Sequence, residues 1–270
     1  MSGFSAEWLA LREPLDRRAR NPDVLGAIAA FFRDSAPLSI LDLGSGTGST
    51  LRALHSCLPM PRCWRLVDND AGLLARAPGM TLPAGVTMET VRHDLGHGIE
   101  TLLDAATGLV TASALIDLVS ERWLAGLVAA VAARSLPVYL ALTYDGRITF
   151  GASDPLDTIV ASAVNRHQRT DKGFGPALGP TAARAAIGLF EDFGYTVIQG
   201  ESDWLTGPDD RAFQNELLTG WIEAATEAGG VPRRDLESWL VRRRQATDAG
   251  SLSVRIGHVD IFACPPPKMA

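Results

Sequence analysis

A glycine-rich turn that follows directly on a short apolar run constrains the fold of this chain more than any other feature. Residues 40–49 read Ile-Leu-Asp-Leu-Gly-Ser-Gly-Thr-Gly-Ser. The apolar run has the length of a buried strand, and the residues after the last glycine are typical of a helix start. Alternating glycines let the backbone approach a ligand closely, and a helix start offers free N–H groups. The pattern therefore predicts a strand, a ligand-binding turn and a helix in succession.

Apolar runs of strand length recur after this turn and alternate with helix candidates. The expected strands are 38–43, 64–67, 86–91, 108–112 and 137–143, and the expected helices are 49–57, 71–77, 99–105 and 121–134. Strands that alternate with helices imply right-handed crossovers and a parallel sheet covered on both faces. The sequence therefore predicts an α/β fold with a doubly wound, mostly parallel sheet.

The segments that flank this alternation predict additions to the sheet. Residues 1–37 have the apolar spacing of two helices. After Thr143 the chain becomes polar and glycine-punctuated, and we expect helices at 154–167 and 181–193, two more within 208–247, and strands at 195–199 and 252–264. We interpret 1–37 as an N-terminal helical lid and 38–270 as one domain with cap insertions at about 144–178 and 204–250.

Composition excludes several classes of protein. The chain has 270 residues, 46% of them apolar, which suits a large globular core. Its 25 basic and 31 acidic residues give a net charge of −6, so nothing attracts it as a whole to nucleic acid or to an anionic membrane. Its three cysteines form no CxxC pair. We expect a cytoplasmic protein, monomeric or homodimeric, without a membrane span, and nucleic acid is an unfavoured partner.

Two common glycine loops fit the turn poorly. A phosphate-binding P-loop has a lysine directly after its last glycine, whereas Ser49 follows Gly48 here. A dinucleotide-binding loop has glycine or alanine at its sixth position for close helix packing, and the larger, polar Ser49 at that position is a poor though possible substitute. Both readings remain as alternatives, and a third loop type fits better.

The turn and the strand ends after it resemble those of class I S-adenosylmethionine-dependent methyltransferases. Asp42 precedes a GxGxG loop, Asp68 ends the second expected strand, Asp94 lies in a His-Asp-Leu triplet after the third, and residues 111–117 follow the fourth. The resemblance is close over 38–143. It implies a Rossmann-like methyltransferase fold of seven strands, with the last strand antiparallel and beside the sixth.

The resemblance also implies a cofactor, S-adenosyl-L-methionine, with S-adenosyl-L-homocysteine as product, and a set of residues that bind it. An acid at the end of the second strand grips the ribose hydroxyls, because a carboxylate accepts hydrogen bonds and donates none. One after the third strand contacts adenine, and the segment after the fourth lines the methionine part. The implied cofactor-binding residues are Asp42, Gly44, Ser45, Gly46, Gly48, Asp68, Asn69, Asp94, Leu95 and Ser113. For Asp42 and Asp94, support of a turn is the alternative.

Polar and aromatic residues gather just past the fifth expected strand, at 144–147 and 165–174. Open parallel sheets bind ligands at that edge, so these residues are candidates for an acceptor pocket, with an ordinary solvated loop as the alternative. His167 is our first candidate base because its pKa lies nearest neutrality, followed by Tyr144 and Asp117. No metal is expected, since glycines interrupt the one His and Asp cluster, at 93–97.

The acceptor itself is constrained only indirectly. Residues 112–115 lack the Asn or Asp followed by two prolines and an aromatic residue that the family uses on base or glutamine nitrogens. The arginines at 233–234 and 242–244 are expected to form a solvated helix surface. We therefore favour a small-molecule acceptor. A methyltransferase of protein or RNA, and a non-catalytic scaffold of the same fold, are the alternatives.

Overall fold

A single sheet of eight strands organises the chain in a computed structural model, which describes residues 4–35, 37–54, 56–59, 62–79, 82 and 84–266. The strands are β1 (Leu38–Leu43), β2 (Arg62–Asp68), β3 (Val86–Arg92), β4 (Thr107–Ser113), β5 (Val138–Phe150), β6 (Thr196–Glu201), β7 (Trp204–Thr206) and β8 (Val254–Cys264). Their order is β3-β2-β1-β4-β5-β8-β6. The short β7 pairs with residues 254–256 of β8, and β6 pairs with residues 259–264 of the same strand. Strands β1 to β5 run parallel, and β8 is antiparallel to β5 and β6, as the sequence predicted.

Alternate side chains of the strands enter two separate cores. Leu41 and Leu43 of β1 face α5 (Glu121–Ala132) and α7 (Ala182–Asp192). Leu38 and Ile40 face α2 (Pro22–Phe31), α3 (Ser49–Leu54) and α4 (Ala71–Leu74). Because successive side chains of a strand point to opposite faces, apolar residues at both alternate sets of positions in β1 are what a sheet covered on both sides requires.

Several predicted boundaries were wrong. The helix expected at 99–105 is only a short 3-10 turn over Ile99–Thr101. Strand β5 does not stop at Thr143 but continues through the polar residues to Phe150. It continues because β8 supplies a partner, with Tyr144 opposite His258 and Ile148 opposite Ile256, and such long-range pairing leaves no local signal. The short β7 was missed for the same reason.

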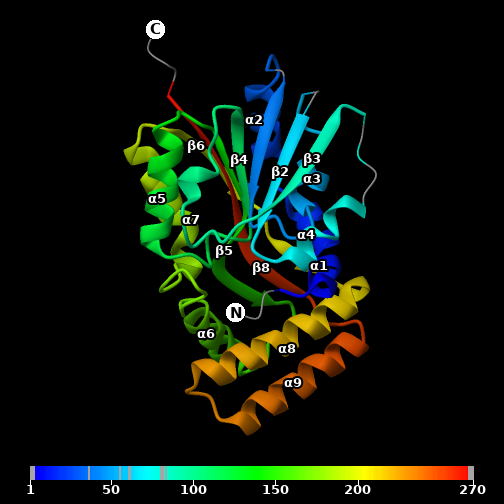
Figure 1. The fold of residues 1–270 in the computed structure, drawn as a ribbon. Coiled ribbons are helices and arrows are strands. Elements are labelled where there is room, and N and C mark those ends of the chain that lie inside the picture. The colour runs from blue at the N-terminus through cyan, green and yellow to red at the C-terminus, as the bar shows by residue number, and fades with distance from the viewer. Residues whose placement is uncertain are drawn as a thin grey trace.

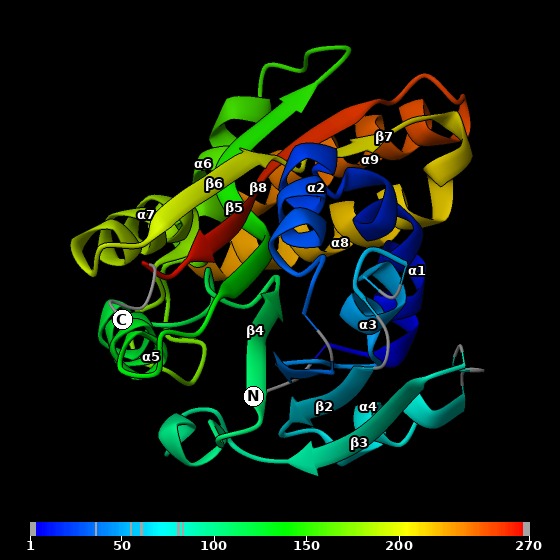
Figure 2. The same ribbon diagram turned by 90° about the horizontal axis from the view of Figure 1, so that it is seen from above.

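Three helices form a layer beyond the carboxyl ends of the parallel strands. They are α6 (Asp157–His167), α8 (Arg211–Ala228) and α9 (Arg233–Asp248), and Figure 1 shows α8 and α9 side by side below the sheet. Their apolar faces bury Phe213, Trp221 and Trp239 in a third core. The N-terminal helix α1 (Ala6–Ala19) contributes Leu15 to that core, and Trp8 stacks on Phe213 at 5.3 Å. Figure 2, seen from above, shows α2 near the centre of the molecule and α1 toward its right-hand side.

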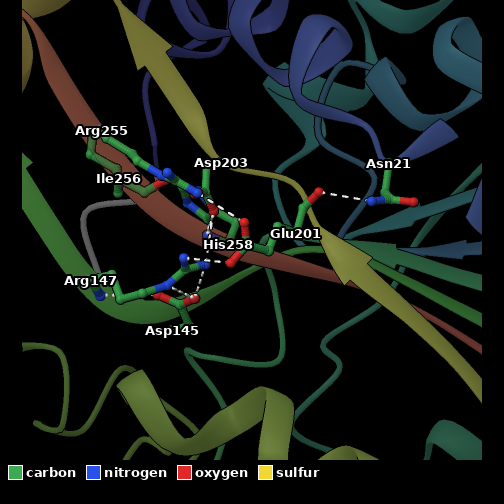
Figure 3. A network of polar contacts seen from close by, with 8 residues as sticks. All are labelled: Asn21, Asp145, Arg147, Glu201, Asp203, Arg255, Ile256 and His258. Carbon is green, nitrogen blue, oxygen red and sulfur yellow. Dashed lines mark hydrogen bonds and ion pairs between the residues drawn. The ribbon is translucent and has the colours of Figure 1, made fainter. Parts of the chain in front are cut away.

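A charged network holds the extended parts of β5 and β8 together (Figure 3). Arg147 donates to Asp145, to Glu201 at 2.8 Å and to Asp203 at 3.0 Å. Arg255 donates to Glu201 at 2.9 Å and also to Asp203. The backbone N–H of His258 donates to Asp203 at 3.0 Å, so the network also fixes the strand that carries this histidine. Among the described residues, no helix is long and apolar enough to cross a membrane.

Candidate functional site

The glycine turn at the end of β1 adopts a backbone that only glycine takes readily. Gly44, Gly46 and Gly48 have φ angles of +63°, +54° and +84°. L-residues with a side chain are strained in this region. A Cβ atom on Gly44 would lie 3.2 Å from the Leu115 side chain, and one on Gly46 would lie 3.1 Å from Leu9. The glycines therefore serve both the turn itself and the close approach of neighbouring segments.

Asp68, at the end of β2, ties this loop to the neighbouring strand. One carboxylate oxygen accepts a hydrogen bond from the N–H of Gly46 at 2.9 Å, and the other accepts from the N–H of Asp70 at 2.9 Å. Each oxygen of a carboxylate can accept two hydrogen bonds, so acceptor capacity remains for a ligand. The next residue, Asn69, has an exposed side chain. Asp68, the predicted ribose-binding residue, thus stands beside the loop.

Asp42 lies directly beneath the loop and is fully buried. Its Oδ1 accepts a hydrogen bond from the Thr111 hydroxyl at 2.7 Å, whereas Oδ2 has no partner among the described residues. Burial raises the pKa of Asp42 to about 7. A buried carboxyl with a free oxygen is costly unless something pairs with it, so this position suits a cationic ligand group or water.

Helix α1 lies over the loop and closes most of the space above it. A cavity of about 30 Å³ remains, lined by Leu9, Arg12, Asp16, Ser113 and the loop itself. This volume is large enough for a water molecule and too small for a nucleoside. Arg52 of α3 links α1 to the loop. Its guanidinium donates to both carboxylate oxygens of Glu13 on α1 and to the Thr47 carbonyl in the loop, the latter at 2.7 Å. A ligand of nucleoside size therefore requires α1 to shift away from the loop.

The remaining predicted cofactor residues lie at two ends of this region. Ser113, at the end of β4, lines the cavity and accepts a hydrogen bond from Arg20. Asp94 and Leu95 follow β3, where the Asp94 side chain is mostly exposed and accepts from the N–H of Gly96 at 2.9 Å. That bond lowers the pKa of Asp94 and makes the residue part of a turn. Its contact with adenine remains a prediction.

Two of the three candidate bases share one environment and the third lies elsewhere. Asp117 follows β4, and its Oδ1 is buried without a described partner. Burial raises its pKa to about 6, and Arg12 lies near enough to oppose that rise. Tyr144 is buried too, donates to Asn165 at 2.6 Å, and has its pKa raised by burial and then by Asp145 and Asp117. His167 instead contacts Glu227 of α8 at 2.8 Å.

Several residues at the site were not predicted from the sequence. They are Arg12, Asp16 and Arg20 on or next to α1, Trp204 on β7 and His258 on β8. Arg12 pairs with Asp16 at 3.0 Å and lies over the Trp204 ring, and Trp204 packs against His258 at 4.6 Å. Charged residues on an N-terminal helix look solvent-facing in a sequence. The one available signal was spacing, because Arg12, Asp16 and Arg20 recur every fourth residue on one helix side.

The expected solvated arginine surface is wrong for one residue. Arg243 is buried in an ion pair with Asp157 and lies 4.5 Å from the centre of the Phe150 ring. Arg242 pairs with Asp154. As for metals, no group of three or more His, Cys, Asp or Glu side chains among the described residues is arranged to hold an ion.

The sheet order identifies the class of fold, and comparisons with known structures agree. No family model and no curated protein matches the sequence. The cyclopropane synthase MmaA2 from Mycobacterium tuberculosis is 12% identical over 96% of this chain and 94% of its own, with a TM-score of 0.51. A cyclopropane-fatty-acyl-phospholipid synthase-like protein from Lactobacillus casei is 14% identical over 97% and 94%, with a TM-score of 0.50. The chain thus has the class I S-adenosylmethionine-dependent methyltransferase fold.

Proposed function

We propose that the protein binds S-adenosyl-L-methionine on the glycine loop and transfers its methyl group to a small molecule. One observation carries the proposal: three left-handed glycines lie between two aspartates of adjacent strands, and both aspartates keep acceptor oxygens for a ligand. Asp68 and Asn69 would hold the ribose. Asp94 and Leu95 would lie at the adenine, and Asp42 and Ser113 at the amino-acid part.

The residues present fit this ligand in charge and in hydrogen bonding. Besides Asp42, the buried Ser45 hydroxyl has no described partner, and it lines the cavity above the loop. The bound cofactor would supply an electrophilic methyl group on a sulfonium. The chain's contribution is then alignment of the acceptor, an effect that reaches about 7 to 11 kcal/mol in well-oriented reactions.

Asp117 is the candidate base that the geometry favours over His167. A general base acts best when its pKa lies near the working pH. Burial raises the pKa of Asp117 to about 6. It lies in the segment that follows β4, after Leu115 and Ile116, and Ala114 at the start of that segment has a strained φ of +49°. Strained residues of this kind gather at functional sites. Asp117 would accept the proton of an acceptor hydroxyl or ammonium, with Tyr144 nearby to orient that group.

The small-molecule reading draws support from what covers the strand ends. Helices α6, α8 and α9 form a layer there, and α1 closes the side above the loop (Figure 1). A macromolecular acceptor would need an open approach and a free docking surface. In helix α9, Arg233, Arg242 and Arg243 are engaged with Glu237, Asp154 and Asp157. These pairings weaken the case for RNA docking.

Calorimetric titration with S-adenosyl-L-homocysteine and, separately, with NADH tests the cofactor. We expect saturable binding of the former only, and an Asp68→Asn variant should weaken it. Transfer of a labelled methyl group from S-adenosyl-L-methionine into a metabolite extract, followed by mass spectrometry, then identifies the acceptor class. Preference for NADH, or label that enters only protein or RNA, would overturn the proposal.

A further inference from the structure

Arg20 is a buried arginine without a carboxylate partner. It follows α1, and only 6% of its surface is exposed. Its guanidinium donates to the Tyr139 hydroxyl at 3.3 Å and to the Ser113 hydroxyl at 3.1 Å. Its Nε is fully buried and has no partner among the described residues. Burying a guanidinium on two neutral oxygens leaves one of its donors unsatisfied, and Asp260 and Asp16 act on its charge only electrostatically, without a direct hydrogen bond.

Other arginines around the loop differ from Arg20 in this respect. Arg12 pairs with Asp16 at 3.0 Å, and Arg52 pairs with Glu13. The nearest acid to Arg20 in the hydrogen-bond network is Asp260, which it reaches only through the Tyr139 hydroxyl, at 2.8 Å from Asp260. Asp260 is itself occupied by the N–H groups of Asn21 and Leu142. The local charges therefore leave Arg20 without a direct counter-ion in the described structure.

Arg20 also lies where space remains under α1. A cavity of about 10 Å³ is lined by Arg20, Asp16, Ser49 and Arg52, among others. The larger cavity over the glycine loop shares Asp16 and Ser49 with it and is also lined by Ser113, the residue that Arg20 contacts. The two cavities thus share two lining residues and lie next to each other between Arg20 and the glycine loop.

The charges along this space are those that an α-amino acid would complement. A guanidinium without a hydrogen-bonded counter-ion lines the smaller cavity, and the Asp42 carboxyl, which lines neither cavity, has its free oxygen beneath the loop. An α-amino acid carries a carboxylate and an ammonium on one carbon, so it can satisfy both groups together. Arginine is well suited to the first role because its planar fork can bind a carboxylate through two parallel hydrogen bonds.

We propose that Arg20 binds the carboxylate of the amino-acid part of the cofactor, beneath α1 and beside Ser113. The inference rests on the proposed function, since that function supplies the amino acid. Because Arg20 directly follows α1, the same contact would couple ligand binding to the position of that helix. A ligand without the carboxylate would keep its nucleoside contacts but lose this one.

The test compares two ligands that differ in one group. Decarboxylated S-adenosylmethionine keeps the adenosyl, sulfonium and ammonium groups of S-adenosyl-L-methionine and lacks only the carboxylate. By calorimetry, the wild-type protein should bind it about 10- to 100-fold more weakly, the range for a hydrogen bond to a charged group. In Arg20→Met, both ligands should bind with nearly equal affinity, at the weaker level.

Arg18→Met is the matched control, because Arg18 lies on α1 and its mostly exposed side chain pairs with Asp210 at 2.9 Å. It should retain the wild-type preference for the carboxylate. Circular dichroism establishes whether Arg20→Met is folded, and the two-ligand comparison on the wild-type protein stands even if it is not.

The outcomes separate this inference from the proposed function. Equal affinity of the wild-type protein for both ligands would overturn the role of Arg20 while leaving cofactor binding intact. So would an Arg20→Met variant that still prefers the carboxylate, since another residue would then bind it. If the wild-type protein binds neither ligand, the proposed function fails, and the inference fails with it.

Discussion

The buried Asp42 should make the ligand-free protein less stable as the pH rises. Its pKa is raised from 3.8 to about 7, so the folded chain keeps a proton that the unfolded chain has lost. The free energy of unfolding should therefore fall between about pH 4 and pH 7 and stay level above. Three pKa units at about 1.4 kcal/mol each give a loss of about 4 kcal/mol, an upper bound.

Asp42→Asn removes the ionisation and keeps an oxygen for the Thr111 hydroxyl. Near pH 4 the variant should be about as stable as the wild-type protein. At pH 8 its free energy of unfolding should exceed that of the wild-type protein by about 2 to 4 kcal/mol. Urea unfolding at several pH values, followed by circular dichroism, measures the difference. Cofactor binding should weaken in the same variant, because the ligand's ammonium would lose its carboxylate.

The matched control is Asp34→Asn, because Asp34 is exposed and makes no hydrogen bond or ion pair with a described residue. It should follow the wild-type pH dependence. A stability difference between Asp42→Asn and wild type that does not change from pH 4 to pH 8 would refute the reasoning. The carboxyl would then be ionised in the folded chain and paired with other groups there.

Three further substitutions test separate parts of the structure. Gly46→Ala should lower stability by about 1 to 2 kcal/mol in thermal unfolding, from the left-handed backbone, and an unchanged midpoint would contradict this. Arg243→Met should cost about 3 to 5 kcal/mol because it leaves Asp157 unpaired, whereas the exposed Arg233→Met should change urea midpoints little. Gly257→Ala should lower the free energy of unfolding by about 1 to 3 kcal/mol, because the new Cβ would collide with the Asp145 carboxylate. A urea midpoint equal to that of the wild-type protein would contradict this, since the charged network would then adjust at no cost.

Much of the fold was predictable because it depends on patterns among residues that are close in the sequence. The apolar run into alternating glycines specified β1, its turn and α3, and Asp68 was placed beside the turn by ending the next strand. Both features depend on backbone conformation and on side-chain alternation, which neighbouring residues determine. The parallel direction of the first five strands followed from the alternation of strands with helices.

What the sequence did not specify depends on contacts between distant segments. The extension of β5 to Phe150 exists because β8 pairs with it, and His258 reaches the site on that strand. Arg243 is buried because Asp157 and Phe150 are brought beside it. Arg20 looked like one of several charges on an exposed helix, and only the position of α1 over the loop buries its guanidinium against Ser113.

The sequence by itself therefore determined the glycine loop and its two aspartates, since φ angles and strand ends are local properties. Tertiary structure alone decided which charges are buried and which lack a partner. Burial and pairing are properties of space rather than of sequence order, and the affinity of the loop for a ligand depends on both.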